Sequence, residues 1–146
     1  MITSRQITLV QNSFAAVLPI TGEVAADFYA RLFALAPDTR ALFRHDMAEQ
    51  GRKLFLTLAT VVDSLDAIER VLPVAEELAV RHVGYGAHDR HYAAVGEALV
   101  GALAATLGGR FDPDTRAGWI AAYSMLSDRM RAAAAGVGHG PIAAAA

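Results

Sequence analysis

The chain has 146 residues, 54% of them hydrophobic, and this length and composition predict one domain with a sizeable core. Its formal net charge is −2 and no basic run is present, which argues against a nucleic-acid partner. The sequence contains no cysteine, so disulfides, thiolate catalysis and cysteine-ligated metal sites are excluded.

The pattern of a signal peptide is missing, because Arg5 and Gln6 interrupt the first apolar residues. The most apolar stretch, 92–109, contains Glu97 and several glycines, and we interpret it as a buried helix rather than a membrane span. We therefore expect a cytoplasmic protein without a membrane span.

Apolar residues recur with helical spacing and no sustained strand alternation is present, which predicts an all-α fold. Thr3 or Ser4 is expected to cap a first helix that ends before Pro19. A second helix begins near Thr21, and Pro37 starts a short helical turn that ends at Phe43. After a polar loop over 44–48, further helices are predicted over about 49–64, up to His82, from Asp89 to Gly108, and after the cap Asp112 and Pro113.

The end of the chain is rich in glycine and alanine and includes Pro141. We expect residues 1–134 to form the domain and residues 135–146 to form a flexible tail.

His82 ends an apolar stripe with Val71, Ala75 and Leu78, whose offsets of four, three and four place all four residues on one helix face. Asp66 and Glu69 have the spacing of a capping box, and Pro73 is expected in the first turn of the short helix that ends in His82. The histidine is either a hydrogen-bonded core residue or a ligand to a group that the apolar face covers. The stripe by itself leaves both interpretations open.

Tyr29 and Gln50 are two further polar residues placed beside core positions, after Phe28 and four residues before Leu54. The structural interpretation of Tyr29 is a packed ring with an exposed hydroxyl. The corresponding interpretation of Gln50 is a solvated or capping residue near a helix start.

Taken in order, these residues resemble the globin family, in particular bacterial single-domain haemoglobins and the haem domain of flavohaemoglobins. The likeness runs from Ile7 to Met130, and both spacing and residue type match on every helix. It implies an all-α globin fold with six to eight helices around a haem pocket. The strings that carry it are 28–33 with Pro37 and 42–43, then 50–54, 72–73 with 79–82, 91–97 with Leu99, and Trp119 with 122–123.

The resemblance assigns roles residue by residue. His82 would be the proximal ligand to the iron of haem b, and Phe43 would wedge against the haem face. Tyr29 and Gln50 would form a distal pair that donates hydrogen bonds to dioxygen. Tyr92 lies where the family places a tyrosine near the ligand histidine. The remaining candidates are Leu54, Leu58, Leu78, Val95, Leu99 and Leu126 as an apolar lining, and Lys53 and Arg81 as propionate partners or, equally, as solvated charges.

Two departures from flavohaemoglobins affect the expected chemistry. The glutamate that joins the proximal tyrosine and histidine in those proteins is replaced here, at the matching position, by Ala134. The sequence also ends after the globin part, so we expect no flavin or nicotinamide domain and a dependence on an external flavin reductase.

Three functions remain open. The first is reversible binding of O2 for transport, storage or a low-oxygen role, with NO and CO as further ligands. The second is nitric oxide dioxygenation, which converts NO and O2 to nitrate with an external reductase. The third is a helical interaction domain without haem. The sequence does not decide between a monomer and a homodimer.

The other histidines have weaker assignments. His45 follows Phe43 in a loop and is either a surface residue or close to the haem edge. His88 and His91 are expected to cap a helix or to be exposed, and His139 lies in the tail.

Overall fold

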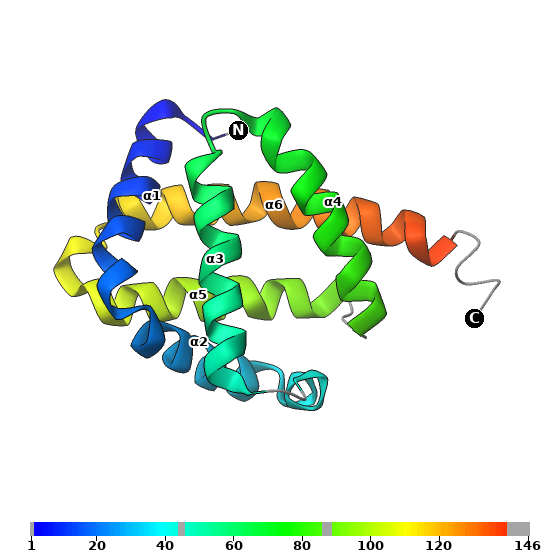
Figure 1. Ribbon diagram of the computed structural model, residues 1–146. Helices are drawn as coiled ribbons and strands as arrows, with labels where there is room; N and C mark the ends of the chain where they lie inside the picture. The colour runs from blue at the N-terminus through cyan, green and yellow to red at the C-terminus, as the bar shows by residue number, and fades with distance from the viewer. Residues whose placement is uncertain (1, 44–45, 86–88, 140–146) are drawn as a thin grey trace.

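The computed structural model describes residues 2–43, 46–85 and 89–139 (Figure 1). Its regular structure in these ranges is helical, with no strand, which confirms the all-α prediction. The α-helices are α1 (Ser4–Val17), α2 (Thr21–Leu35), α3 (Met47–Asp63), α4 (Ile68–Tyr85), α5 (Asp89–Leu107) and α6 (Pro113–His139), and the 3-10 helices are η1 (Leu18–Ile20), η2 (Pro37–Leu42) and η3 (Gly108–Arg110).

Capping residues begin the helices largely as predicted. Thr3 and Gln6 form a capping box, with the Gln6 N–H donating to Thr3 Oγ1 at 3.1 Å. The Thr115 N–H donates to Asp112 Oδ1 at 2.8 Å at the start of α6. Helix α3 begins two residues earlier than predicted, because Asp46 accepts a hydrogen bond from the Ala48 N–H and caps the helix.

The helix that carries His82 is longer than predicted. Helix α4 begins at Ile68, so Pro73 lies inside it, and the prediction that this proline occupies the first turn was wrong. A proline has no N–H, so the carbonyl of Glu69 loses its intrahelical donor. Glu69 is exposed, which lets water replace that donor, and burial of Val71 stabilises the added turn.

Helix α5 is the central helix of the fold. It packs against α2 and runs antiparallel to α6, and Ala98, Ala102 and Leu103 are fully enclosed (Figure 1). By length and composition the segment Arg90–Arg110 is apolar enough to cross a membrane. The core helix of a globular fold passes the same test, and burial against two neighbours supports that interpretation here.

The apolar core consists of two clusters. The main cluster joins α1, α2, α3, α5 and α6 and includes Val71 of α4. The second cluster lies between α4, α5 and α6 and consists of Ala75, Ala79, Tyr92 and Met130. Helices α3 and α4 diverge from the turn that joins them, and each packs on different neighbours: α3 on α2 and α1, and α4 on α6 (Figure 1).

Trp119 connects α6 to α1 within the main cluster. Its indole N–H donates to Ser13 Oγ at 2.8 Å, and its ring centroid lies 6.2 Å from that of Phe14. Because the indole is buried, this hydrogen bond satisfies a donor that water does not reach.

At the C-terminal end, α6 continues to His139. The residues after it lie outside the described part of the chain, so the flexible tail stays a prediction.

Candidate functional site

His82 lies in the last turn of α4 and is half-buried. Its Nδ1 lies 2.6 Å from the carbonyl oxygen of Leu78, one turn earlier in the helix. Val71 and Ala75 are buried, which confirms that the apolar stripe faces inward. A carbonyl oxygen can only accept, so this contact places the proton on Nδ1 and the lone pair of a neutral imidazole on Nε2.

Tyr29 is fixed in α2 by three aromatic neighbours. Its ring centroid lies 4.9 Å from that of Phe28, 6.0 Å from that of Phe33 and 5.2 Å from that of Phe43. The side chain is only 6% exposed. Such packing leaves the hydroxyl as the one polar group to be satisfied.

The structure brings Tyr29 and Gln50 together, although not in the predicted way. The Tyr29 hydroxyl donates to the backbone carbonyl of Gln50 at 3.5 Å, a long hydrogen bond. Burial raises the pKa of Tyr29 to about 12, and the Gln50 side chain opposes the shift. The phenol therefore remains a neutral donor across the physiological pH range.

The predicted apolar lining lies at the edges of the two core clusters, except for Leu99, which is a buried member of the main cluster. Phe43 is half-buried at the end of η2, and Leu126 contacts both clusters. Leu54, Leu58 and Val95 are half-buried against the main cluster, Leu78 is half-buried against the second, and Leu99 is buried.

The two candidate propionate partners are both exposed. Arg81 donates to Glu77 at 2.5 Å, and Lys53 lies on the exposed surface of α3. These positions suit solvated charges and leave the propionate role a prediction.

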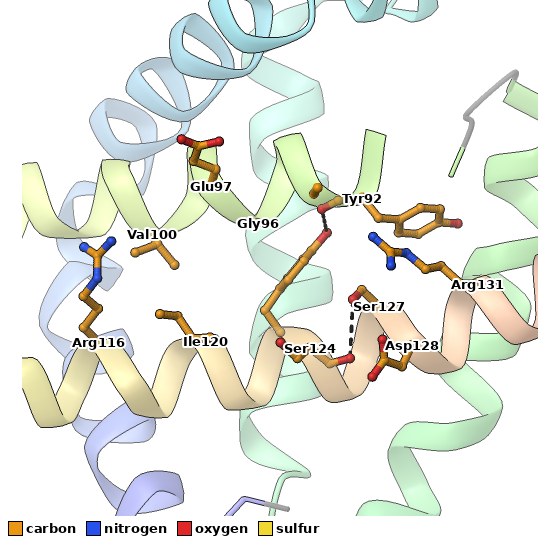
Figure 2. Close-up of a pocket in the computed structure, with 12 residues that line it drawn as sticks. Tyr92, Gly96, Glu97, Val100, Arg116, Ile120, Ser124, Ser127, Asp128 and Arg131 are labelled. Carbon is orange, nitrogen blue, oxygen red and sulfur yellow. Dashed lines mark hydrogen bonds between the residues drawn. The ribbon is translucent and has the colours of Figure 1, made fainter. Parts of the chain in front are cut away.

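Tyr92 is buried in the second core cluster beside Ala134, and Tyr123 donates its hydroxyl to the Tyr92 carbonyl at 2.6 Å. The Arg131 guanidinium lies 5.7 Å from the centre of the Tyr92 ring. Figure 2 shows Tyr92 and Arg131 along a surface hollow between α5 and α6, which has a volume of about 320 Å³ and is also lined by Tyr123. Position 134 supplies no carboxylate to the cluster around Tyr92, whereas Asp128 and Glu97 line the same hollow as this tyrosine.

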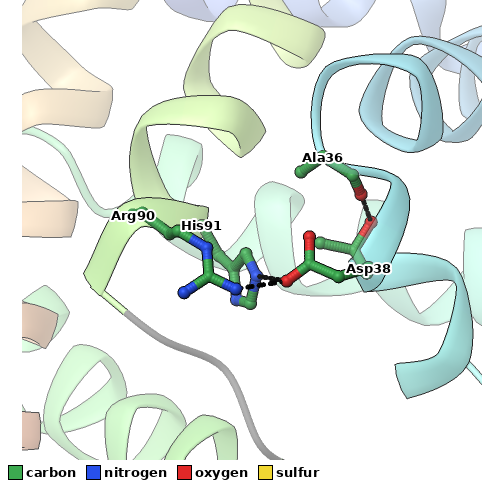
Figure 3. A network of polar contacts seen from close by, with 5 residues as sticks. Ala36, Asp38, Arg90 and His91 are labelled. Atoms are coloured by element: carbon green, nitrogen blue, oxygen red, sulfur yellow. Dashed lines mark hydrogen bonds and ion pairs between the residues drawn. The ribbon is translucent and has the colours of Figure 1, made fainter.

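His91 is the residue that sequence reasoning misplaced. It is buried rather than exposed or capping, and its Nε2 lies 2.9 Å from Asp38 Oδ2 (Figure 3). Asp38 is 53 residues away in sequence, so no local pattern pairs them. One feature of the sequence could have predicted its burial. The segment that forms α5 is apolar on most sides, and such a helix is usually buried, which leaves His91 little access to solvent.

Among the other histidines, His45 and His88 lie outside the described residues, and His139 ends α6.

A globin family model matches residues 26–130, which is more than half of the chain and includes Tyr29, Gln50 and His82. The chain belongs to the globin family. As a member of this family it is a haem-binding protein, in agreement with the fold and with the histidine at the end of α4.

Similar proteins include flavohaemoproteins from three bacteria. That of Bordetella parapertussis is 30% identical over 129 residues, covering 86% of this globin and 32% of the relative. That of Deinococcus radiodurans is 29% identical over 133 residues, covering 89% and 33%, and that of Halalkalibacterium halodurans is 28% identical over 120 residues, covering 77% and 29%. This globin thus spans about a third of the length of these relatives.

Proposed function

We propose that this globin binds one haem b through His82 and reversibly binds dioxygen beside Tyr29 and Gln50. The observation that carries the proposal is the 2.6 Å contact between His82 Nδ1 and the Leu78 carbonyl. It orients the ring, fixes the tautomer and puts the lone pair on Nε2, as a ligand to iron requires. The donor set therefore fits a haem.

The haem, when bound, would supply the iron at which a diatomic gas binds. Phe43, Leu54, Leu58, Leu78, Val95, Leu99 and Leu126 would contact it and exclude water. Tyr29 would donate its hydroxyl hydrogen to the gas, giving up the long bond to the Gln50 carbonyl. The Gln50 side chain would supply a second donor, since its amide carries two N–H groups.

Nitric oxide dioxygenation is the second candidate. The distal pair and the similarity to flavohaemoproteins favour it, because donors that hold O2 also polarise it. In this reaction NO, O2 and one electron give nitrate, and a separate flavin reductase would replace the electron. We favour O2 binding, because Ala134 supplies no carboxylate beside Tyr92 to strengthen the proximal ligand.

Absorption spectra of the ferric, ferrous, O2-bound and CO-bound protein test the proposal. We expect a Soret band at one haem per chain in the wild type and in His139→Ala, which serves as the histidine control. His82→Ala should lose the haem during purification or show a different axial ligand. An unchanged ferrous spectrum in His82→Ala would contradict the assignment, and a wild type that takes up no haem would establish the helical interaction domain instead.

A further inference from the structure

A polar network of Asp38, Arg90 and His91 joins η2 to the beginning of α5 (Figure 3). None of these residues is among the proposed haem contacts. Asp38 Oδ2 accepts from His91 Nε2 at 2.9 Å and from the Arg90 guanidinium at 2.5 Å. His91 is 5% exposed, whereas the Asp38 side chain is 48% exposed. A buried histidine is thus bound to a carboxylate that reaches it from another element.

The location of this network relates it to both sides of the candidate site. Asp38 lies in the first turn of η2, and Phe43 directly follows the last residue of that helix. His91 directly precedes Tyr92 of the second core cluster. A displacement of η2 relative to α5 would therefore change the separation between Phe43 and the proximal side.

Helix η2 is attached on two sides. Asp38 joins it to α5, and the helix also packs on α2, where Phe43 contacts Tyr29 and Phe33. The N-terminal end of η2, at Ala36, has no side-chain cap. Hydrogen bonds from His91 and Arg90 lower the pKa of Asp38 to about 2, so its carboxylate stays charged at physiological pH.

We propose that Asp38 is a positioning residue of the haem site, which acts through His91 to hold η2, and with it Phe43, against the beginning of α5. This inference rests on the proposed function, because Phe43 matters here as a contact of the haem. Residues that fix the orientation of the groups around a bound metal commonly affect its retention by about tenfold or more.

The test measures the rate of haem loss to an excess of a haem-accepting apoprotein. Asp38→Ala should lose haem about tenfold faster than the wild type, and Asp38→Glu should recover part of the difference. Asp114→Ala is the matched control, because Asp114 forms a 3.0 Å ion pair with Arg5 whose side chains are 67% and 73% exposed. Thermal unfolding of the same variants is measured in parallel, and the faster haem loss of Asp38→Ala should persist at temperatures well below the onset of its unfolding, which separates positioning from a loss of overall stability.

A double-mutant cycle identifies the partner through which Asp38 acts. In a His91→Phe background, Asp38→Ala should have a much smaller effect on haem loss than in the wild type. An unchanged rate in Asp38→Ala, an equal acceleration in the Asp114 control, or fully additive effects in the cycle would each overturn the inference while leaving haem binding intact. A wild type that binds no haem would instead overturn the proposed function, and this inference with it.

Discussion

The polar end of Tyr29 determines what this side chain can do, because aromatic rings surround the rest of it. Its hydroxyl is directed at α3, where the nearest acceptor is the Gln50 carbonyl at 3.5 Å. A hydrogen bond of this length is readily exchanged for a shorter one to a ligand. The aromatic neighbours therefore hold the ring in place, whereas the hydroxyl hydrogen can turn from the Gln50 carbonyl to a ligand.

Substitution of the distal pair tests this role. Tyr29→Phe and Gln50→Leu should each cost about 1–3 kcal/mol of O2 stabilisation, which corresponds to about tenfold to a hundredfold faster O2 release. CO release, measured by ligand replacement in the same variants, should change much less, because CO accepts hydrogen bonds poorly. Equal acceleration for both gases would indicate steric gating. The effects of the two substitutions should not add, since the residues contact each other.

The raised pKa of Tyr29 predicts a dependence of stability on alkaline pH. Because its pKa is about 12 in the folded protein and about 10 when exposed, folding favours the protonated phenol. This contribution is fully present below about pH 10 and is lost as the pH rises towards and through about 12.

Urea unfolding at about pH 9 and about pH 11 should show a smaller alkaline loss of stability in Tyr29→Phe than in the wild type. Burial also raises the pKa of Tyr123, so part of the loss should remain in this variant. An identical pH dependence in both proteins would show that Tyr29 is not buried in the folded state.

Helices α5 and α6 depend on a glycine at their contact. A Cβ at Gly96 would lie 2.6 Å from Cε2 of Tyr123, whose hydroxyl is held by the Tyr92 carbonyl. The ring cannot give way without losing that hydrogen bond. Close approach, rather than backbone conformation, explains this glycine.

Gly96→Ala should therefore lower the free energy of unfolding by about 1–3 kcal/mol, despite the better helix propensity of alanine. Gly22→Ala in α2 is the control, because a Cβ there meets nothing within 4 Å. We expect this control to be neutral or slightly stabilising in urea unfolding. If Gly96→Ala is as stable as Gly22→Ala, the Tyr123 ring does not pack against Gly96.

The elements were predicted best where their signals are local. The caps at Thr3 and Asp112 act within three residues, and both helices begin where these residues indicate. The place of Pro73 in α4 was mispredicted, because a proline favours a helix start locally. The helix instead begins at Ile68, close to the capping-box residue Asp66, and burial of Val71 stabilises this first part. His91 and Asp38 show the same limit for the candidate site, since their contact depends on how distant elements pack.

At the scale of the whole molecule, this globin corresponds to about a third of each of its flavohaemoprotein relatives. The matched family region and the helices around it occupy most of the 146 residues. In the proposed nitric oxide dioxygenation, the electrons for repeated turnover would come from a separate flavin reductase. The two candidate functions differ in this requirement, because O2 binding by itself consumes no electrons.

Nitric oxide consumption under turnover conditions should reveal the difference. We expect the O2-bound protein to react with NO once, and NADH alone to sustain negligible further consumption. Addition of a flavin reductase should restore measurable NO consumption, followed with an NO electrode. Tyr29→Phe should reduce this restored rate, because less O2 remains bound. Rapid multiple turnover with NADH and no reductase would contradict the proposed dependence on a separate reductase.

The buried indole on α6 gives the protein an intrinsic optical reporter. Trp119 is the only tryptophan in the chain, it is 3% exposed, and its N–H is bonded to Ser13. Its emission in the haem-free protein should lie at short wavelength, and unfolding should shift it to the red. A haem held in the same small domain would absorb at the emission wavelengths and quench the fluorescence by energy transfer. Titration with haem can therefore be followed on the unmodified protein, without a label and without substituting a residue of the site.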